Sequence, residues 1–146
     1  MTADAAARLG PLFAAIDPWR SYRFDPAQLT RYLLTVEADA PRFEIVCGGE
    51  TAGAIGTRLN WLRGPYLQFL GLLPHSQSRG LGRQLLQWFE DEARSRGDRN
   101  AWVAVSEFNV GAQRFYERFG FVHAARLPDL VSDGVTEILM RKILTG

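Results

Sequence analysis

The segment QSRGLGR, Gln77–Arg83, places two glycines and two arginines at the start of a predicted helix. The N-terminus of a helix has unpaired N–H groups and a partial positive charge, and it therefore binds phosphates. Gly80 and Gly82 let the backbone turn tightly and approach an anion closely. Arg79 and Arg83 flank a helix start that normally favours acidic residues by ~0.3–1 kcal/mol per charge, and a bound polyphosphate would reverse this preference. The segment predicts a phosphate-binding loop; solvated arginines at an ordinary helix start are the alternative.

Two other phosphate-binding patterns are absent from the sequence. The dinucleotide-binding pattern Gly-x-Gly-x-x-Gly fails because Leu85 stands at the position of the third glycine. The nucleotide-binding pattern Gly-x-x-x-x-Gly-Lys-[Ser/Thr] has no counterpart, since the only lysine of the chain is Lys142. A dinucleotide or ATP site of these two types is therefore not expected.

A second segment, Asn109–Phe121, reads NVGAQRFYERFGF and follows the first after one predicted helix and one short predicted strand. Together the two segments resemble the GCN5-related N-acetyltransferase (GNAT) superfamily. The first resembles its acetyl-CoA pyrophosphate loop, and the second resembles the strand–helix motif that follows this loop. The resemblance covers about residues 66–121 and rests on the patterns Gln77-x-x-Gly80-x-Gly82 and Asn109-x-x-Ala112-x-x-Phe115-Tyr116-x-x-Phe119-Gly120-Phe121.

This resemblance implies acetyl-CoA as the cofactor and assigns residues to it. Backbone N–H groups of the glycine loop would bind the pyrophosphate. The backbone at the end of the preceding strand would pair with the pantetheine arm, and an asparagine would hydrogen-bond the arm from the other side. The cofactor-binding residues implied in this way are Leu72, Gln77, Ser78, Arg79, Gly80, Leu81, Gly82, Arg83 and Asn109.

The resemblance also implies that Tyr116 is the general acid that protonates the leaving thiolate. A tyrosine hydroxyl has an ordinary pKa near ~10, so it is protonated at neutral pH and can donate a proton. A backbone N–H near Leu72 would stabilise the oxyanion that forms on the thioester carbonyl. Core packing beside Phe115 and Phe119 is the structural alternative for Tyr116.

The general base is less clear from the sequence. An amine with a pKa near ~10.4 must lose a proton before it can attack a carbonyl carbon. Many members of the superfamily carry a glutamate in the strand before the glycine loop, but residues 66–70 read YLQFL and contain no carboxylate. Three candidate bases remain, namely Glu107, Glu137 and His75.

Members of the superfamily commonly build the acceptor pocket from two segments. One corresponds here to residues 17–25, DPWRSYRFD, between the first two predicted helices, and the other to residues 127–134. Trp19, Tyr22 and Phe24 are therefore expected to line the substrate pocket. A loop fixed to the core by these aromatic side chains explains them equally well.

Composition narrows the possible classes of protein. With 146 residues the chain is expected to form one N-acetyltransferase domain over 1–146, as a monomer or homodimer. The net charge of +1 argues against a nucleic-acid or anionic-membrane binder. Cys47 is the only cysteine and His75 and His123 are the only histidines, so neither an internal disulfide nor a metal site is expected. No secretory signal and no stretch of roughly 20 apolar residues is present, which favours a cytoplasmic location.

Hydrophobic periodicity and turn residues predict the elements in the order α α β β β α β α β β. The leading strand that is usual in the superfamily is missing or very short. The second helix should bury Leu29, Leu33 and Val36, and the third should bury a stripe that includes Trp88 and leaves Glu90 on its polar side. The predicted helices cover residues 3–16, a segment starting at 25, 80–96 and 109–119, and the predicted strands cover 42–47, 51–59, 66–73, 101–106, 121–127 and 135–143.

Strand, helix and strand over residues 66–106 form a βαβ crossover, so its two strands should be parallel neighbours. The hairpins on either side should add antiparallel strands. The predicted fold is therefore α/β, with a mixed, mostly antiparallel sheet and helices on both faces. The resemblance further implies the acyl-CoA N-acyltransferase fold, in which the two parallel strands of the crossover splay apart.

These observations predict an N-acetyltransferase that moves an acetyl group from acetyl-CoA to a primary amine by direct attack on the thioester. The acceptor would be a small molecule, a peptide or a protein. A non-catalytic CoA-binding regulatory module is one alternative, motivated by the missing strand carboxylate. A protein-interaction domain, in which the glycine loop is only a helix cap, is the other.

Overall fold

The computed structural model describes residues 1–144 of the chain, which forms two compact units. The first unit comprises Met1–Thr57 and Phe69–Gly82, and the second comprises Arg58–Gln68 and Arg83–Gly146. The single domain expected over residues 1–146 stays a prediction, and residues 145–146 lie outside the described part.

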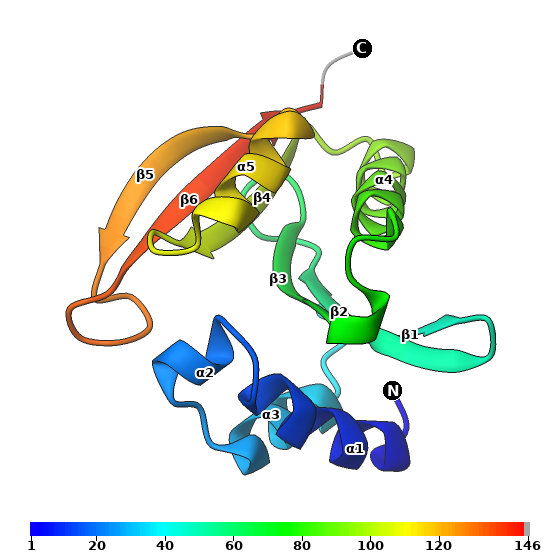
Figure 1. Cartoon of the computed structure of the whole chain (residues 1–146). Helices are drawn as coiled ribbons and strands as arrows, with labels where there is room; N and C mark the ends of the chain where they lie inside the picture. Colours follow the sequence, from blue (N-terminus) through cyan, green and yellow to red (C-terminus); the bar gives the residue numbers. More distant parts are fainter. Residues whose placement is uncertain (145–146) are drawn as a thin grey trace. The chain divides into compact units, whose positions relative to one another are not determined.

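The predicted helices and strands are all present, with bounds within two residues of the prediction (Figure 1). Among the described residues, the first strand begins at Arg42, in agreement with the expected lack of a leading strand. The elements are α1 Ala3–Ala14, α2 Trp19–Tyr22, α3 Pro26–Leu34, β1 Arg42–Cys47, β2 Glu50–Arg58, β3 Tyr66–Leu72, the 3-10 helix η1 Pro74–Ser76, α4 Leu81–Ser95, β4 Asn100–Ser106, α5 Val110–Arg118, β5 Val122–Pro128 and β6 Thr136–Ile143.

Six strands are hydrogen-bonded in the order β1-β2-β3-β4-β6-β5, and β3 contributes residues to both units. β3 and β4 are parallel, with Tyr66 opposite Trp102, as the βαβ crossover predicted. The pairs β1–β2, β4–β6 and β5–β6 are antiparallel. The predicted α/β class with a mixed, mostly antiparallel sheet is therefore confirmed.

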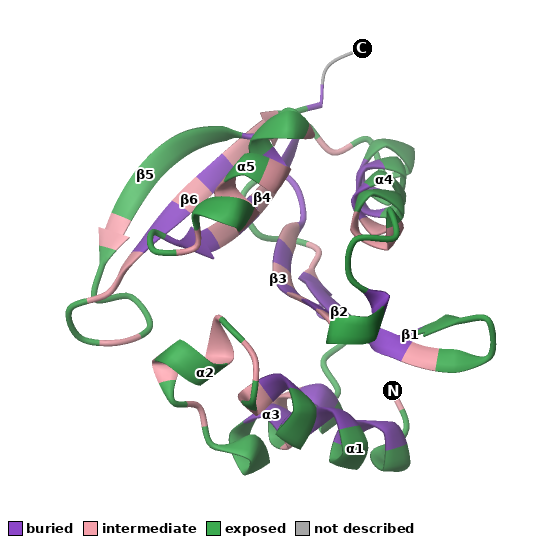
Figure 2. Ribbon diagram, viewed as in Figure 1, coloured by how far each residue is buried: buried purple, intermediate pink, exposed green. Residues whose placement is uncertain are grey.

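The first unit is built on a core that α1 and α3 share with strand residues (Figure 2). Asp25 caps α3 in a capping box with Gln28. The expectation that Val36 is buried is wrong, because α3 ends at Leu34 and the Val36 side chain is 94% exposed. The core consists of Ala6, Leu9, Phe13, Leu29, Leu33, Ala54, Phe69 and Leu73.

The second unit buries a face of α4 that agrees with the predicted stripe at Phe89 and Ala93 and differs from it at Trp88. Leu86, Phe89 and Ala93 are buried at the spacing of one helical face, whereas Trp88 is exposed. Glu90, expected on the polar side, is buried as well, because Lys142 and Arg94 pair with its carboxylate. The buried strand residues of this unit include Ala101, Val103, Val105, Ile138 and Met140.

The described residues were compared with the requirements of a membrane-spanning helix and of a metal site. No helix within residues 1–144 is both long and apolar enough to cross a membrane. In the same residues no group of three or more His, Cys, Asp or Glu side chains is arranged to hold a metal ion.

Candidate functional site

The Gln77–Gly82 loop belongs to the first unit and follows η1. Ser78 and Gly80 both have left-handed backbone conformations, with φ angles of 62° and 75°. A Cβ atom built on Gly80 would meet no atom within 4 Å, so the space beside this residue is open. Alternating turns of this kind direct successive backbone N–H groups toward one side, where they form a concavity suited to an anion. The tight turn predicted at Gly80 is therefore present, whereas Gly82 lies in the first turn of α4.

The start of α4 differs in charge from the starts of the two long helices of the first unit. α1 is capped by Thr2 and has Asp4 in its first turn, and α3 is capped by Asp25. The first turn of α4 contains no acidic residue, and Arg83 is exposed there. No acidic side chain in that turn therefore offsets the positive end of the helix dipole, which favours an external anion.

The end of β3 is braced from within the loop. Gln77 Nε2 donates a hydrogen bond of 3.0 Å to the carbonyl oxygen of Leu72, and the N–H of Leu73 donates one of 2.8 Å to Ala52 O. Gln77 is thus engaged as a brace between the loop and the strand that precedes it. This contact gives Gln77 a structural role in addition to the cofactor role that the resemblance implied.

In the second unit, the end of β4 brings several predicted site residues together. The N–H of Asn109 donates to Ser106 O at 2.9 Å, and the N–H of Glu107 donates to Thr136 O at 2.9 Å. Ser106 is paired with Glu137 in the register of β4 and β6. Asn109, Glu107 and Glu137 therefore all lie where β4 ends and β6 begins.

Asn109 is the N-cap of α5, and its Oδ1 accepts a hydrogen bond of 3.1 Å from the N–H of Ala112. Asparagine is among the residues that cap helices best. Because the cap uses the side-chain oxygen, any hydrogen bond from this side chain to a ligand would come from its amide N–H groups. Gln113 also fixes this end of α5, since its Nε2 donates to Glu107 O at 2.8 Å, a contact that the sequence reading missed.

Tyr116 lies in the last turn of α5 and is buried, with 8% of its surface exposed. Its ring makes edge contacts with Phe115 and Phe121, at centroid distances of 5.2 and 5.8 Å. Burial, and in smaller part the neighbouring Tyr66, raises the pKa of the Tyr116 hydroxyl well above its ordinary value. Tyr116 is therefore protonated at neutral pH, and its catalytic role stays a prediction.

The candidate bases differ in their surroundings. Glu107 forms two hydrogen bonds with Arg126, at 2.8 and 3.1 Å, and these lower the pKa of the Glu107 carboxyl. Glu137 is buried, with 6% of its surface exposed. Tyr66, a residue that sequence reasoning did not single out, has a pKa raised by burial and then by the charge of Glu137. His75 is exposed in η1 of the first unit.

Two of the three aromatic residues expected in the acceptor pocket, Trp19 and Phe24, pack against the core of the first unit. Trp19 stacks on Phe69 at 4.6 Å and contacts Phe13 at 5.2 Å, and Phe24 is also packed against this core. Tyr22 lies beside Phe24, with ring centroids 5.9 Å apart. The segment also contains the short helix α2, which the sequence reading described as a loop. These contacts favour the packing alternative, and the pocket role of the three residues stays a prediction.

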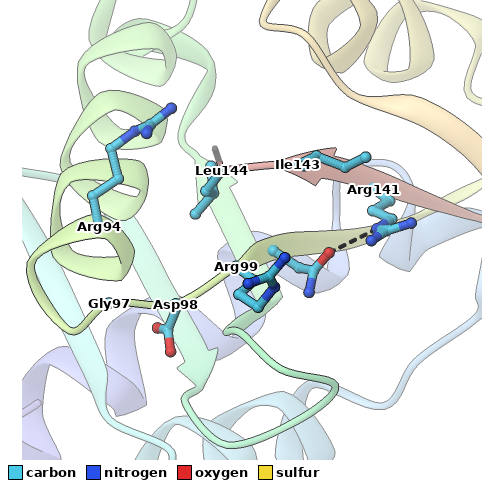
Figure 3. Close-up of a pocket in the computed structure, with 8 residues that line it drawn as sticks. Arg94, Gly97, Asp98, Arg99, Arg141, Ile143 and Leu144 are labelled. Carbon is cyan, nitrogen blue, oxygen red and sulfur yellow. Dashed lines mark hydrogen bonds between the residues drawn. The ribbon is translucent and has the colours of Figure 1, made fainter. Parts of the chain in front are cut away.

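A pocket of about 410 Å³ opens in the second unit after the C-terminal end of α4 (Figure 3). Arg141 donates to Asn100 Oδ1 at 2.7 Å, and Arg94 is paired with Glu90, so two of its cations already have partners within the chain. None of the predicted site residues lines this pocket. Its lining residues are Arg94, Gly97, Asp98, Arg99, Asn100, Arg141, Ile143 and Leu144.

Comparison with known proteins gives consistent matches. Residues 11–121 match the Acetyltransferase (GNAT) family. The [ribosomal protein bS18]-alanine N-acetyltransferase of Escherichia coli strain K12 is 32% identical over 107 residues, which are 73% of this chain and 66% of that enzyme. The chain thus matches about two thirds of the length of this relative.

Solved structures also share the fold of this chain. The ribosomal-protein-S18-alanine N-acetyltransferase of Escherichia coli has a TM-score of 0.73 at 22% identity, covering 99% of this chain and 90% of that one. An aminoglycoside 6'-N-acetyltransferase complexed with coenzyme A has a TM-score of 0.75 at 17% identity, covering 99% and 93%. At these identities the likeness shows the fold alone, and it agrees with the fold predicted from the sequence.

Proposed function

Since the chain belongs to the acetyltransferase (GNAT) family, we propose that it is an N-acetyltransferase that moves an acetyl group from acetyl-CoA to a primary amine by direct attack of the amine on the thioester. The family is the one that the two sequence motifs resembled. The roles of individual residues below are part of this proposal, and they are supported by the local geometry of each unit.

The observation that carries the proposal is the backbone of the Gln77–Gly82 loop in a chain of this family. Coenzyme A contains a pyrophosphate, and an exposed loop with left-handed turns at Ser78 and Gly80 offers N–H groups to such an anion. Arg79 and Arg83 would add charge-assisted contacts to the phosphates. The residues present therefore fit the group.

The pantetheine arm would be held by polar groups of the chain. We assign the backbone of Leu72 to it, because Gln77 holds the carbonyl of this residue in place. We assign the side-chain N–H groups of Asn109 to it as well, because the N-cap fixes the orientation of that amide. Bound acetyl-CoA would supply a thioester carbonyl as the site of attack and a thiolate as the leaving group.

Tyr116 is proposed to donate its Oη proton to the leaving sulfur. Its raised pKa keeps the hydroxyl protonated at neutral pH. Glu137 is proposed as the base that takes the proton of the attacking amine, ahead of Glu107. The paired Arg126 lowers the pKa of Glu107 and makes that carboxylate a weaker proton acceptor. In this scheme one C–N bond forms and one C–S bond breaks, and each proton has a named donor or acceptor.

The acceptor is proposed to be a primary amine of a peptide, a protein or a small molecule. The relative that is 32% identical is named as an N-acetyltransferase of an alanine in a ribosomal protein, and the protein in the coenzyme A complex is named as an aminoglycoside N-acetyltransferase. The first of these has the higher sequence identity. A peptide with a free N-terminal alanine is therefore the first acceptor to test.

The proposal is tested by titrating coenzyme A into the protein in a calorimeter and by measuring acetylation of a panel of amines with acetyl-CoA. We expect saturable binding and turnover with at least one amine. Binding without turnover for any peptide, protein or small amine would favour the regulatory module. No binding at millimolar coenzyme A, in a folded sample, would favour the interaction domain and refute the proposal.

A further inference from the structure

The only lysine of the chain joins three elements of the second unit. Lys142 lies on β6 and forms an ion pair with Glu90 of α4. Its Nζ also donates a hydrogen bond of 2.8 Å to the carbonyl oxygen of Phe119 and lies 4.5 Å from the centre of the Phe119 ring. Phe119 is the C-cap of α5, so a single ammonium group contacts both helices from one strand.

The side chains of this contact are mostly withdrawn from water. The exposed fractions of the Lys142 and Glu90 side chains are 21% and 12%. Burial by itself would raise the pKa of Glu90, but hydrogen bonds from Lys142 and Arg94 outweigh it and the pKa is lowered. The carboxylate is therefore charged at neutral pH, and it holds the ammonium in place.

The backbone beyond Phe119 leaves little freedom at this point. Gly120 has a φ of 104°, and a Cβ built there would lie 3.1 Å from Cε of Lys142. The N–H groups of Phe119 and Phe121 both donate to Tyr116 O, at 3.1 Å each. The carbonyl held by Lys142 and the turn that carries Tyr116 are thus parts of one hydrogen-bonded segment.

We propose that Lys142 is a positioning residue, which holds the last turn of α5 and thereby sets the place of the Tyr116 hydroxyl for proton donation. This inference rests on the proposed function, because it takes Tyr116 as the general acid. Asn109 lies at the opposite end of α5, so the effect is expected on the chemical step more than on coenzyme binding. A group that is misplaced by a fraction of an ångström loses much of its catalytic effect.

The test compares Lys142→Met with the double variant Glu90→Met/Lys142→Met. The single variant leaves the Glu90 carboxylate buried without its ammonium partner and should lose thermal stability. The double variant replaces both charges with apolar side chains, so its melting temperature should recover. The carbonyl of Phe119 has lost its donor in both variants, and we expect kcat to fall at least tenfold in both, with the KM for acetyl-CoA changing less than threefold.

Amide hydrogen exchange at Phe121 supplies a readout that does not depend on activity. Its N–H should exchange at least tenfold faster in the double variant than in the wild type. Val103→Ala serves as the control, since it lowers stability by removing buried apolar atoms in β4, outside the contact between Lys142, Glu90 and Phe119, and it should keep kcat and the normalised exchange rate at Phe121.

The outcomes separate the two claims. A double variant with recovered stability, wild-type kcat and wild-type exchange would overturn the role of Lys142 and leave the acetyltransferase intact. A wild-type protein that acetylates no amine would refute the proposed function, while faster exchange at Phe121 would still show that Lys142 holds the turn.

Discussion

The Gln77–Gly82 loop and helix α5 contribute to the proposed reaction in opposite ways. The loop is exposed and offers backbone N–H groups, shaped by left-handed conformations at Ser78 and Gly80. α5 offers side chains, with Asn109 fixed as the N-cap and Tyr116 buried among aromatic rings. The loop therefore depends on which φ angles its residues can adopt, whereas α5 depends on which functional groups it carries.

This difference has a physical consequence for substitutions. A change in the loop acts through backbone conformation or through charge near an anion, so it should alter coenzyme binding. A change at Tyr116 removes one proton donor and should alter the chemical step. The pattern of kcat and coenzyme affinity across variants therefore distinguishes the two regions.

The largest effect is expected for Tyr116→Phe. This variant keeps the ring and its contacts with Phe115 and Phe121 but removes the hydroxyl. Loss of a general acid typically costs roughly 10²–10⁴-fold, and we expect kcat to fall within that range. Steady-state kinetics with acetyl-CoA and the best amine, together with calorimetry with coenzyme A, measure the two quantities.

Coenzyme affinity within threefold of the wild type is the matching expectation for Tyr116→Phe. If kcat were unchanged in a variant that binds coenzyme A normally, Tyr116 would be a packing residue only. The contrast between α5 and the loop would then disappear.

A smaller effect, about 10²-fold in kcat, is expected for Glu137→Gln, which removes the proposed base. Glu107→Gln should lower kcat only about threefold, because it mainly breaks the pair with Arg126. Arg126 lowers the pKa of Glu107 from its ordinary value of 4.5. The ion pair between the two side chains is therefore fully present above pH 4.5, and it is lost as the pH falls through the lowered pKa. Rates for the two variants over a range of pH decide between the carboxylates, and a larger loss for Glu107→Gln would reverse the assignment.

Gly82→Asp is expected to weaken coenzyme A binding at least about tenfold, the factor that corresponds to ~1.4 kcal/mol. The added carboxylate would stand in the first turn of α4, beside the proposed phosphates. Gly82→Asn has almost the same shape without the charge and is the matched control. Calorimetry should show a clearly smaller loss for Asn, whereas equal losses would mean that the side chain acts by its size.

The features that could be predicted from the sequence are those governed by residues close together along the chain. The capping box of Asp25 and Gln28 and the turn at Gly80 follow from local backbone preferences. Element order and strand direction follow from periodicity and from the geometry of a βαβ unit. The two motifs and their spacing were enough to identify the family.

The features that could not be predicted depend on residues far apart in the sequence. The burial of Glu90 could not be predicted from its own helix. Its partner Lys142 lies 52 positions further along the chain (142 − 90). Trp88 was expected to be buried, since periodicity alone does not show which side of a helix meets a strand. The pairing of Glu107 with Arg126, which lowers the pKa of Glu107, likewise depends on the position of β5.

The smallest effect is expected for Ser78→Gly, which tests whether the loop binds through its main chain. Ser78 has a φ of 62°, a conformation that costs a side-chain-bearing residue ~1–2 kcal/mol and glycine very little. Glycine keeps the N–H but makes the free loop more flexible, so coenzyme A affinity should fall by no more than about threefold. Ser78→Pro removes the N–H and forces φ to about −65°, so it should abolish the turn and most of the binding. If the Ser78 hydroxyl were the ligand, Ser78→Gly would itself weaken binding by much more than threefold, and the loop would then act through a side chain as α5 does.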